Sequence, residues 1–476
     1  MSTVLARPLR DNVIDETASM ASARTGLSLP DPALIRARWS RLLHNREALT
    51  VLLFAVLSPA LGLVANRLLT QAVAPVALGE LYLYMNLGLW LTIPATSAFV
   101  YLMRHWGIAR ARGAELLFAR GAIRGLLLQA VICLTGALAF AAFGLIPLLP
   151  ALVLALTIHG IGGAAAQIFI AIPGLERRRV LAGFLGLLSQ PVRLIALWAG
   201  ALLFLARPTG DGLLKVQAVY SLLLGLLAAA LFLRWLKRLG AIEGVSGGDE
   251  LTLRSFATFS APYLFTAVLT QVANSAERWG LARFQDPAAT ALFVQGVGLS
   301  TAIAGAFTQV LNTYYTPIIS TAAAVDPLPL RGARKPVLAY LVLTGLALGM
   351  MVACVAFLSG PLTVVLFGPR YAAVGPLLPW TACGAALFAG GQALAMVPFV
   401  TRDAIGQNVA RSIALVTYSA ALILLPHVEQ AALVFSKLFA AGNGLYLLLM
   451  LGVVLVQVRA HRQRRAQLAG SFPSAS

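Results

Sequence analysis

Charged residues are scarce in this sequence: they make up 11% of its 476 residues, whereas 59% are hydrophobic. Water-soluble domains are about a quarter charged and about half apolar, so this scarcity excludes an ordinary soluble protein. The hydrophobic residues lie in blocks of about twenty, the length that a helix needs to cross hydrocarbon. Because hydrocarbon holds no water, each block must satisfy its own backbone as a helix. The ten-residue alternation typical of membrane barrel strands is absent.

Cysteine is also rare. Cys133, Cys354 and Cys383 lie inside apolar blocks and form no CxxC pair. This pattern argues against a disulfide framework or a thiolate metal site, and it favours small core residues. The first 48 residues contain seven arginines and lack a long apolar core. We therefore expect no cleavable signal peptide.

Enzyme motifs are missing as well. The sequence contains no HExxH, no Gly-x-Ser-x-Gly, no P-loop and no group of carboxylates in a large loop. We therefore expect neither catalysis nor a resident metal or cofactor. Coupling of the chain's activity to H⁺ or Na⁺ stays open at this point.

The apolar blocks predict an all-α polytopic membrane protein with about twelve transmembrane helices. The spans are expected near residues 49–64, 77–103, 122–143, 147–171, 181–205, 214–233, 256–275, 288–315, 337–358, 374–400, 411–426 and 431–458.

The positions of the basic residues predict an orientation. With the N-terminus in the cytoplasm, 28 of the 36 Lys and Arg residues fall in predicted cytoplasmic segments and six in outer segments. This asymmetry follows the rule that basic residues stay on the cytoplasmic side. We therefore expect both termini in the cytoplasm. The net charge of +19 then indicates contact with anionic lipid rather than with nucleic acid.

These spans divide the chain into five parts. We expect a polar cytoplasmic N-terminus at 1–48, a six-helix lobe at 49–233, a cytoplasmic linker at 234–255, a second six-helix lobe at 256–458 and a cytoplasmic tail at 459–476. Residues 32–47 form either an amphipathic helix on the membrane surface or a solvated lead-in to the first span.

An internal duplication supports the two lobes. Pro-Leu-Leu-Pro occurs at 147–150 and again at 376–379, in spans four and ten, and a Gly-Gly pair follows each copy. A weaker echo relates Ala65-Asn66-Arg67 in span one to Ala276-Glu277-Arg278 in span seven. Each match joins spans that are six apart, so both halves enter the membrane in the same sense. Transporters commonly place their site between such halves.

Three stretches resemble a known family. AERWGLARFQDPAATALFVQGVGLS (276–300) resembles the seventh-to-eighth span segment of Wzx-type polysaccharide flippases, in the multidrug/oligosaccharidyl-lipid/polysaccharide (MOP) exporter superfamily. PLTVVLFGPRYAAVGPLLPW (361–380) resembles that family's motif before span ten, and ALGELYLYMNL (77–87) resembles its opening of span two. The chain departs from the family by its longer polar N-terminus.

The resemblance implies a MATE-like fold of two six-helix lobes around a cavity that opens alternately to each side. It implies a bacterial inner-membrane flippase that moves undecaprenyl-diphosphate-linked oligosaccharide units to the periplasmic leaflet for exopolysaccharide, capsule or O-antigen synthesis. The implied partners are this lipid-linked substrate, membrane lipids, and a polysaccharide polymerase with its export machinery.

Two cations lie inside predicted spans. Arg193 follows Gln190 and Pro191 in span five, and Lys437 lies in span twelve. A charge inside a span is costly, so it generally faces a cavity or a partner. Both cations are candidates for binding diphosphate, which Arg can bind in a bidentate manner. The alternatives are that Arg193 caps carbonyls freed by Pro191, and that Lys437 reaches the outer interface.

Three further residues are candidates for ion coupling. His159 lies in the middle of span four, where it either titrates or makes a neutral hydrogen bond between helices. Glu277 and Arg278 are adjacent at the outer boundary of span seven.

Uncharged polar residues in the spans either line the predicted cavity or hold helices together. They are Gln190, Gln271, Asn274, Gln295, Gln309, Asn312 and Gln392.

Two other functions stay open. A MATE-like exporter of small amphiphiles would favour a more acidic cavity than the in-span cations indicate. A membrane-embedded polysaccharide polymerase or ligase would usually have a sizeable outer loop, and the predicted outer loops are short.

Overall fold

The computed structural model describes residues 46–111, 115–147, 149–175, 181, 184–185, 188–204, 206–238, 253–325, 329–401, 404–426 and 428–470. The chain divides into two compact units, Met1–Val51 and Leu52–Ser476. Nearly all of the predicted N-terminal region, with most of the candidate amphipathic helix at 32–47, lies outside the described residues. Most of the predicted linker at 234–255 and the last six residues of the tail lie outside them too.

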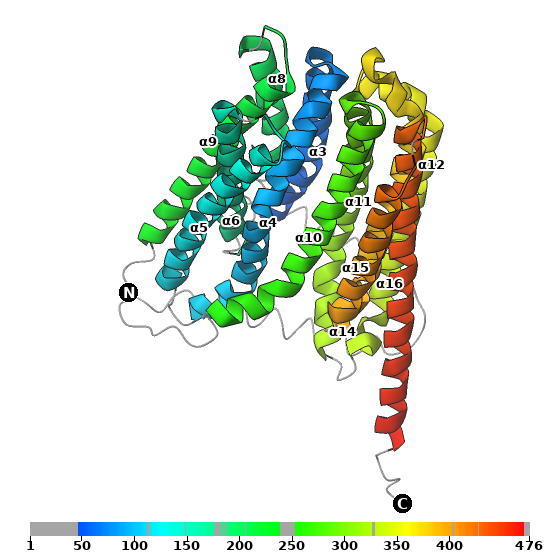
Figure 1. Cartoon of the computed structure of the whole chain (residues 1–476). Helices are drawn as coiled ribbons and strands as arrows, with labels where there is room; N and C mark the ends of the chain where they lie inside the picture. Colours follow the sequence, from blue (N-terminus) through cyan, green and yellow to red (C-terminus); the bar gives the residue numbers. More distant parts are fainter. Residues whose placement is uncertain are drawn as a thin grey trace, which may run out of the picture. The chain divides into compact units, whose positions relative to one another are not determined.

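The described residues of the second unit are almost entirely helical (Figure 1). The helices are α3 (Arg46–Ala72, which starts in the first unit), α4 (Pro75–Ala111), α5 (Glu115–Ala142), α6 (Pro150–Leu175), a π-helical turn (Leu188–Val192), α8 (Arg193–Phe204), α9 (Gly210–Arg238), α10 (Leu253–Phe284), α11 (Pro287–Val325), α12 (Pro329–Leu366), a 3₁₀ segment η3 (Pro369–Leu377), α13 (Leu378–Leu394), α14 (Met396–Thr401), α15 (Ala404–Ile423) and α16 (Ala431–Gly470).

Local sequence explains where several helices begin. Pro75, Pro150, Pro287 and Pro329 each occupy the first position of a helix. Proline suits this position because its fixed φ matches the helix and its missing N–H would have no partner there. Asp286 precedes α11, and its side chain accepts a hydrogen bond from the backbone N–H of residue 289 at 2.9 Å. That contact is a standard N-terminal cap.

Two glycines end helices with a left-handed backbone. Gly144 follows α5 with φ of +71°, and Gly368 follows α12 with φ of +90°. Only glycine adopts such φ values without steric cost. The backbone N–H of Gly368 turns back to the carbonyl oxygens of Thr363 and Val364, at 3.2 and 3.1 Å. This turn separates α12 from η3 and so brings η3 across the end of the bundle.

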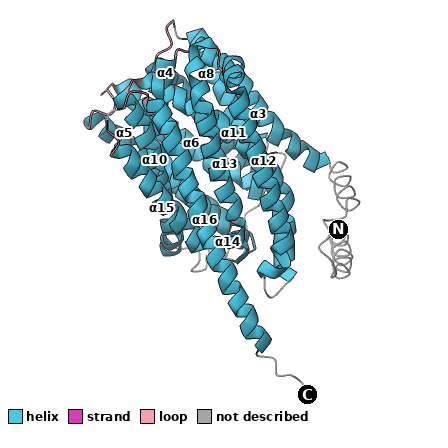
Figure 2. Cartoon of the chain, turned by 90° about the vertical axis from the view of Figure 1, so that its right-hand side faces the viewer, coloured by secondary structure: helices cyan, strands magenta, loops and turns pink. Residues whose placement is uncertain are grey.

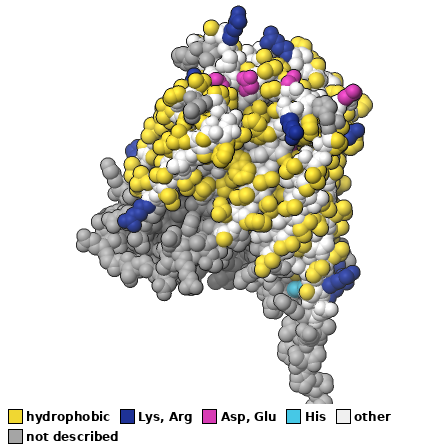
Figure 3. Space-filling view, in the orientation of Figure 1, with side chains coloured by type: hydrophobic (Ala, Val, Ile, Leu, Met, Phe, Trp, Pro, Cys, Tyr) yellow, Lys and Arg dark blue, Asp and Glu magenta, His cyan; other side chains and the backbone are white. Residues whose placement is uncertain are grey.

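The helices meet the requirements for crossing a membrane. Among the described residues, eight helical segments are long and apolar enough to do so, and Arg193–Leu203 is a shorter apolar helix. Many large apolar side chains on these helices face outward, such as Leu346 at 67% exposure and Phe357 at 88%. In Figure 3 hydrophobic side chains cover the middle of the visible face, while charged side chains lie mainly near its upper and lower edges. The chain is a multi-pass membrane protein.

The helices form two groups. In the N-terminal lobe (α3–α9), α4, α5 and α6 pack against one another, and α9 packs against α4 and α6. In the C-terminal lobe (α10–α16), α11, α12, α13 and α16 form the packed centre, and α15 lies against α10 and α16. The π-helical turn and α8 belong to the predicted fifth span, and α13 and α14 count as one span. With these assignments the arrangement fits the predicted twelve-helix fold.

Glycines in the duplicated Gly-Gly motifs allow close packing. A Cβ atom on Gly162 of α6 would collide with the backbone of Ser221 on α9. A Cβ on Gly391 of α13 would meet the ring of Tyr446 on α16, the nearest ring atom lying 2.5 Å away. Small residues at membrane helix contacts let helices approach closely. Helix α16 is the longest of these elements and extends past the ends of its neighbours (Figures 1 and 2).

Candidate functional site

The two lobes meet at one end of the bundle. We call it the short-loop end, because it carries the connections that follow α3, α5, α8, α10, α12 and α15, at the top of Figure 1. Helix α4 of the N-terminal lobe packs against both α10 and α11 of the C-terminal lobe. Near its start, a Cβ atom on Gly79 would collide with the backbone carbonyl of Pro287, the first residue of α11. The lobes are therefore in direct backbone contact at this end.

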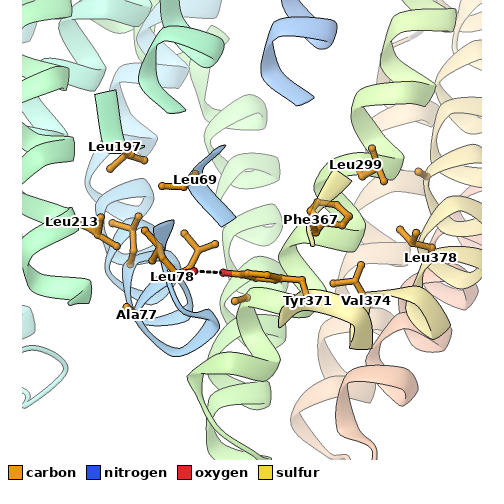
Figure 4. Close-up of a cluster of buried hydrophobic side chains, with 14 of the residues drawn as sticks. Leu69, Ala77, Leu78, Leu197, Leu213, Leu299, Phe367, Tyr371, Val374 and Leu378 are labelled. Carbon is orange, nitrogen blue, oxygen red and sulfur yellow. Dashed lines mark hydrogen bonds between the residues drawn. The ribbon is translucent and has the colours of Figure 1, made fainter. Parts of the chain in front are cut away.

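One hydrophobic core spans both lobes near the short-loop end (Figure 4). The N-terminal lobe contributes Leu69, Leu78, Leu197 and Leu213, and the C-terminal lobe contributes Leu299, Phe367, Val374 and Leu378. Tyr371 of η3 lies between these groups, fully buried. Its hydroxyl donates a hydrogen bond of 3.1 Å to the backbone oxygen of Val73, at the end of α3. This core closes the gap between the lobes with apolar side chains.

A chain of polar side chains crosses between the lobes beside this core. Gln295 of α11 is buried, at 4% exposure. Its Oε1 accepts a hydrogen bond of 2.7 Å from Nδ2 of Asn66 on α3. Its Nε2 donates one of 2.9 Å to the hydroxyl of Tyr82 on α4. Gln295 was predicted either to line a cavity or to hold helices together, and here it joins two helices of the opposite lobe.

A second polar contact joins α4 to α10. Asn86 of α4 is completely buried. Its Oδ1 accepts hydrogen bonds from Ser275 Oγ at 2.9 Å and from Trp279 Nε1 at 3.3 Å. Its backbone oxygen accepts one from Gln271 Nε2 at 2.8 Å. Trp90, one turn further along α4, donates from Nε1 to Ser275 Oγ at 2.8 Å. We call these five residues the α4–α10 seam.

Two arginines, one from each lobe, flank Tyr82. Arg193 begins α8 and Arg278 lies on α10, and both are close enough to Tyr82 for electrostatic interaction. The Nε atom of each arginine is buried without a hydrogen-bond partner. A buried polar group without a partner is costly, and more so when it carries charge. Each guanidinium group thus has one buried nitrogen without an acceptor, and Tyr82 is within electrostatic range of both. We call Arg193, Arg278 and Tyr82 the arginine site.

Arg67 adds a third cation at the short-loop end. It follows Asn66 on α3, and its Nη1 is buried without a hydrogen-bond partner. A Cβ atom on Gly368 would collide with this Nη1, so the glycine leaves room for the guanidinium group. Arg67 and Arg278 are the two arginines that the duplicated Ala-x-Arg pattern relates. The pattern thus marks an arginine with a buried, unpartnered nitrogen in each lobe.

The fifth span changes helix type directly before Arg193. Leu188–Val192 form a π-helical turn that contains Pro191. Proline removes a backbone N–H, and single π-turns frequently occur at functional sites. The Nε of Arg193 is buried and has no hydrogen-bond partner. Gln190 lies in the same turn, and its side chain lies outside the described residues.

Glu277 is buried next to Arg278. Its exposure is 8%, and its Oε1 accepts a hydrogen bond of 2.8 Å from the hydroxyl of Tyr418 on α15. The contact joins α10 to α15 inside the C-terminal lobe. Glu277 is thus a buried carboxyl group, and its predicted role in ion coupling stays a prediction.

His159 lies on α6 in the N-terminal lobe. Its Nδ1 is 2.8 Å from Ser221 Oγ on α9, and Ser221 also accepts a hydrogen bond of 3.2 Å from Gln217. A Cβ atom on Gly88 of α4 would lie 2.7 Å from its Cδ2. Arg193 is within electrostatic range of the ring. His159 therefore makes a hydrogen bond between helices, which is one of its two predicted interpretations.

Lys437 lies apart from the arginine site. Its side chain is exposed, and its Nζ is 5.4 Å from the centre of the Trp380 ring on α13. Trp380 is itself 42% exposed. A cation over an exposed tryptophan is typical of an interfacial contact. The structure does not bring Lys437 together with Arg193.

The other predicted polar residues are dispersed over the C-terminal lobe. Asn312 accepts a hydrogen bond of 2.6 Å from Tyr340 on α12, and Gln392 donates one of 3.1 Å to Tyr446 on α16. Asn274 is partly buried on α10, and Gln309 is exposed on α11. These residues join helices within one lobe or lie on its surface, whereas Gln271 and Gln295 cross between lobes.

Sequence reasoning did not select Asn66, Arg67, Tyr82, Asn86 or Trp90 as site residues. Two signals pointed toward them. Asn66 and Arg67 lie in the duplicated Ala-x-Arg pattern, and Tyr82 and Asn86 lie in the 77–87 stretch that resembles the flippase motif. In each case the sequence pattern marked a segment of the chain but no single residue. Only the structure shows which residues of that segment contact the other lobe.

Comparisons with known proteins identify the fold. No protein-family model and no curated protein sequence matches the chain. The structure is similar to an inward-facing multidrug resistance MATE transporter of the MOP superfamily, with a TM-score of 0.52 and 13% identity over 88% of this chain and 99% of that chain. A mutant of the Vibrio cholerae MATE transporter VcmN gives a TM-score of 0.56 at 16% identity, over 86% and 95% of the two chains.

The lipid II flippase MurJ in an inward closed conformation is also similar, with a TM-score of 0.50 and 12% identity over 89% of this chain and 93% of that chain. At these identities the likeness concerns the fold. It confirms the expected fold class, an all-α membrane protein with the MATE-like arrangement of twelve helices in two lobes.

Proposed function

We propose that this chain is a flippase that moves an undecaprenyl-diphosphate-linked oligosaccharide from the cytoplasmic to the periplasmic leaflet by alternating access. The arginine site is the observation that carries the proposal. Arg193 and Arg278 come from opposite lobes, and each has a buried nitrogen that needs an acceptor. A diphosphate supplies several anionic oxygens, and guanidinium groups bind such oxygens in a bidentate manner.

A diphosphate cannot cross hydrocarbon unaided, because an unpaired charge is very costly to transfer out of water. Cations held between two lobes lower this cost, since the anion exchanges water for fixed guanidinium groups. The polyprenyl tail needs no such path and stays in the lipid during transfer. The sugar crosses with the diphosphate, past the uncharged polar groups that lie between the lobes.

The orientation follows from the distribution of basic residues. We propose an inner-membrane location with both termini in the cytoplasm, which makes the short-loop end periplasmic. The contacts between the lobes then lie on the periplasmic side. On this assignment the structure corresponds to a state closed toward the periplasm, in which the arginine site receives substrate from the cytoplasm.

Ion coupling is part of the proposal. Glu277 is the candidate for carrying H⁺, because it is buried beside Arg278 with one hydrogen bond from Tyr418. His159 is the second candidate, through its contact with Ser221. Protonation of Glu277 removes a negative charge next to Arg278 and so changes how strongly the arginine site holds an anion. Na⁺ coupling is the alternative at the same carboxylate.

A MATE-like exporter of small amphiphiles is the second candidate function, and the fold fits it equally well. The charge of the site distinguishes the exporter from the flippase. An exporter of cationic compounds needs acidic groups between its lobes. Here Tyr82 is within electrostatic range of two arginines, and the neighbouring carboxylate Glu277 accepts a hydrogen bond from Tyr418 within the C-terminal lobe. A polymerase or ligase is the third candidate, with no observation in its favour.

Deletion of the gene tests the proposed function. We expect one surface polysaccharide to disappear while its lipid-linked unit accumulates in the cytoplasmic leaflet, because synthesis continues without transfer. The partners predicted from this function, a polymerase and export machinery, would remain present but lack substrate. A strain that lacks every other flippase and still makes the polysaccharide normally, without accumulation, would rule the function out.

A further inference from the structure

The α4–α10 seam differs from ordinary polar contacts between membrane helices. Asn86 Oδ1 receives two hydrogen bonds, from Ser275 and Trp279, and its backbone oxygen receives a third, from Gln271. Trp90 then extends the network to Ser275. Each of these bonds joins the N-terminal lobe to the C-terminal lobe. The seam therefore holds the lobes to each other and leaves the packing within each lobe unaffected.

The seam is also incompletely satisfied. Nδ2 of Asn86 is buried and has no hydrogen-bond partner. An unsatisfied buried donor makes the closed arrangement less stable than a fully paired network would be. The bonds of the seam come almost entirely from side chains, so their separation leaves both helices intact. Such a contact suits reversible opening better than permanent attachment.

The seam continues directly into the arginine site. Asn86 follows Tyr82 by one helical turn on α4, and Trp279 follows Arg278 on α10. Because α4 and α10 run in opposite directions here, the seam lies next to Tyr82 and Arg278 along this pair of helices, while Arg193 approaches Tyr82 from α8. A movement that separates α4 from α10 must break the seam and change the surroundings of Tyr82 and Arg278. If α11 moves together with α10, the movement also breaks the contact of Gly79 with Pro287.

We propose that the α4–α10 seam is a latch between the lobes, in which Asn86 and Trp90 hold Gln271, Ser275 and Trp279, and that it opens and recloses once in each transport cycle. The proposal rests on the proposed alternating-access function. The alternative is permanent attachment, in which the same hydrogen bonds persist in all states and the lobes move about other contacts.

A reversible disulfide across the seam distinguishes a latch that opens from a permanent attachment. Asn86→Cys and Ser275→Cys are combined in a chain in which Cys133, Cys354 and Cys383 are replaced by Ala. The matched control is Ser300→Cys with Thr381→Cys, because these buried side chains of α11 and α13 are 2.9 Å apart within one lobe. Flipping of a polyprenyl-diphosphate-linked sugar is measured in liposomes, for oxidised and reduced protein.

We expect oxidation of the seam pair to lower the flipping rate at least tenfold and reduction to restore it. The protein with the control pair should flip at the same rate in both states. A cross-linked seam pair that flips as fast as its reduced form would overturn the latch, because opening would then be unnecessary.

A distance measurement tests opening of the latch without relying on transport of the proposed substrate. Spin labels are placed at Val76 of α4 and at Gln285 between α10 and α11, both exposed at the short-loop end. We expect Asn86→Ala to increase the population of long distances, and Ser300→Ala to leave it unchanged. If distances respond while the polyprenyl substrate is not flipped, the latch holds and the proposed substrate is wrong. A distribution that Asn86→Ala leaves unchanged contradicts the latch.

Discussion

Gln295 of α11 donates a hydrogen bond of 2.9 Å to the hydroxyl of Tyr82 on α4, and so ties the C-terminal lobe to the N-terminal lobe beside the arginine site. Tyr82 in turn lies within electrostatic range of Arg193 and Arg278. One tyrosine thus contacts the closure between the lobes and faces the cations proposed to bind substrate. On the proposed function, we therefore expect occupancy of the arginine site to affect the separation of the lobes.

Arg278→Gln tests the contribution of the C-terminal lobe to anion binding. A hydrogen bond to a charged group contributes about 1.5–3 kcal/mol, so we expect the apparent affinity for the lipid-linked diphosphate to fall by about ten- to a hundredfold. Arg283→Gln is the matched control, because Arg283 lies on the same helix and is exposed. Concentration-dependent flipping in liposomes measures the effect. Equal affinities in the two variants would remove Arg278 from the site.

Arg193→Ala and Arg193→Lys test the other lobe. Alanine removes the cation, and we expect transport to fall at least tenfold at an unchanged level of folded protein. Lysine keeps the charge without the bidentate geometry, so we expect part of the activity to remain. Polysaccharide production in a complemented deletion strain measures both variants, with Arg207→Ala as an exposed control. Full activity in Arg193→Ala argues that the residue is structural.

Gly79→Val tests the closure at the short-loop end. Any Cβ at this position collides with Pro287, so we expect the side chain to act as a wedge that keeps the lobes apart. A cysteine placed at Ala291, which is fully buried in the core that both lobes share, should then react faster with a maleimide. Gly62→Val is the control, because a Cβ on Gly62 meets nothing within 4 Å. The prediction fails if the two variants react at the same rate.

Glu277→Gln tests proton coupling. Glutamine cannot exchange a proton, but its carbonyl oxygen still accepts the hydrogen bond from Tyr418. We therefore expect flipping to continue at a reduced rate and to lose its response to an imposed proton gradient. Glu429→Gln, at an exposed carboxylate, should keep that response. A gradient response that survives in Glu277→Gln assigns coupling to another residue, with His159 as the next candidate.

Much of the fold was predictable because membrane insertion leaves a strong trace in sequence. Blocks of about twenty apolar residues specify helices, since no other structure satisfies the backbone in hydrocarbon. The predicted second span at 77–103 corresponds to α4 at Pro75–Ala111, and the predicted tenth span at 374–400 corresponds to α13 with its flanking segments. Helix ends beyond the hydrocarbon carry no such trace, so α4 and α16 extend further than predicted.

The candidate site was predictable only in part. Hydropathy identifies a charge inside a span, but it does not give the rotation of the helix about its axis. Arg193 and Lys437 are equivalent by that criterion, yet Arg193 has a buried Nε within electrostatic range of Tyr82, whereas Lys437 is exposed over Trp380. Contacts across the lobes could not be predicted from the sequence for a related reason. Asn86 and Gln271 are 185 residues apart, and the local sequence around either residue does not indicate that the other is its partner.

Flipping by purified protein tests the central claim most directly. The wild-type chain, Arg278→Gln and Arg283→Gln are reconstituted in liposomes that contain a polyprenyl-diphosphate-linked sugar, and the appearance of the sugar in the opposite leaflet is followed with an impermeant lectin. We expect transfer by the wild type and by Arg283→Gln, and a transfer rate at least tenfold lower for Arg278→Gln at limiting substrate. No transfer by the wild type, or equal transfer by all three proteins, would contradict the account.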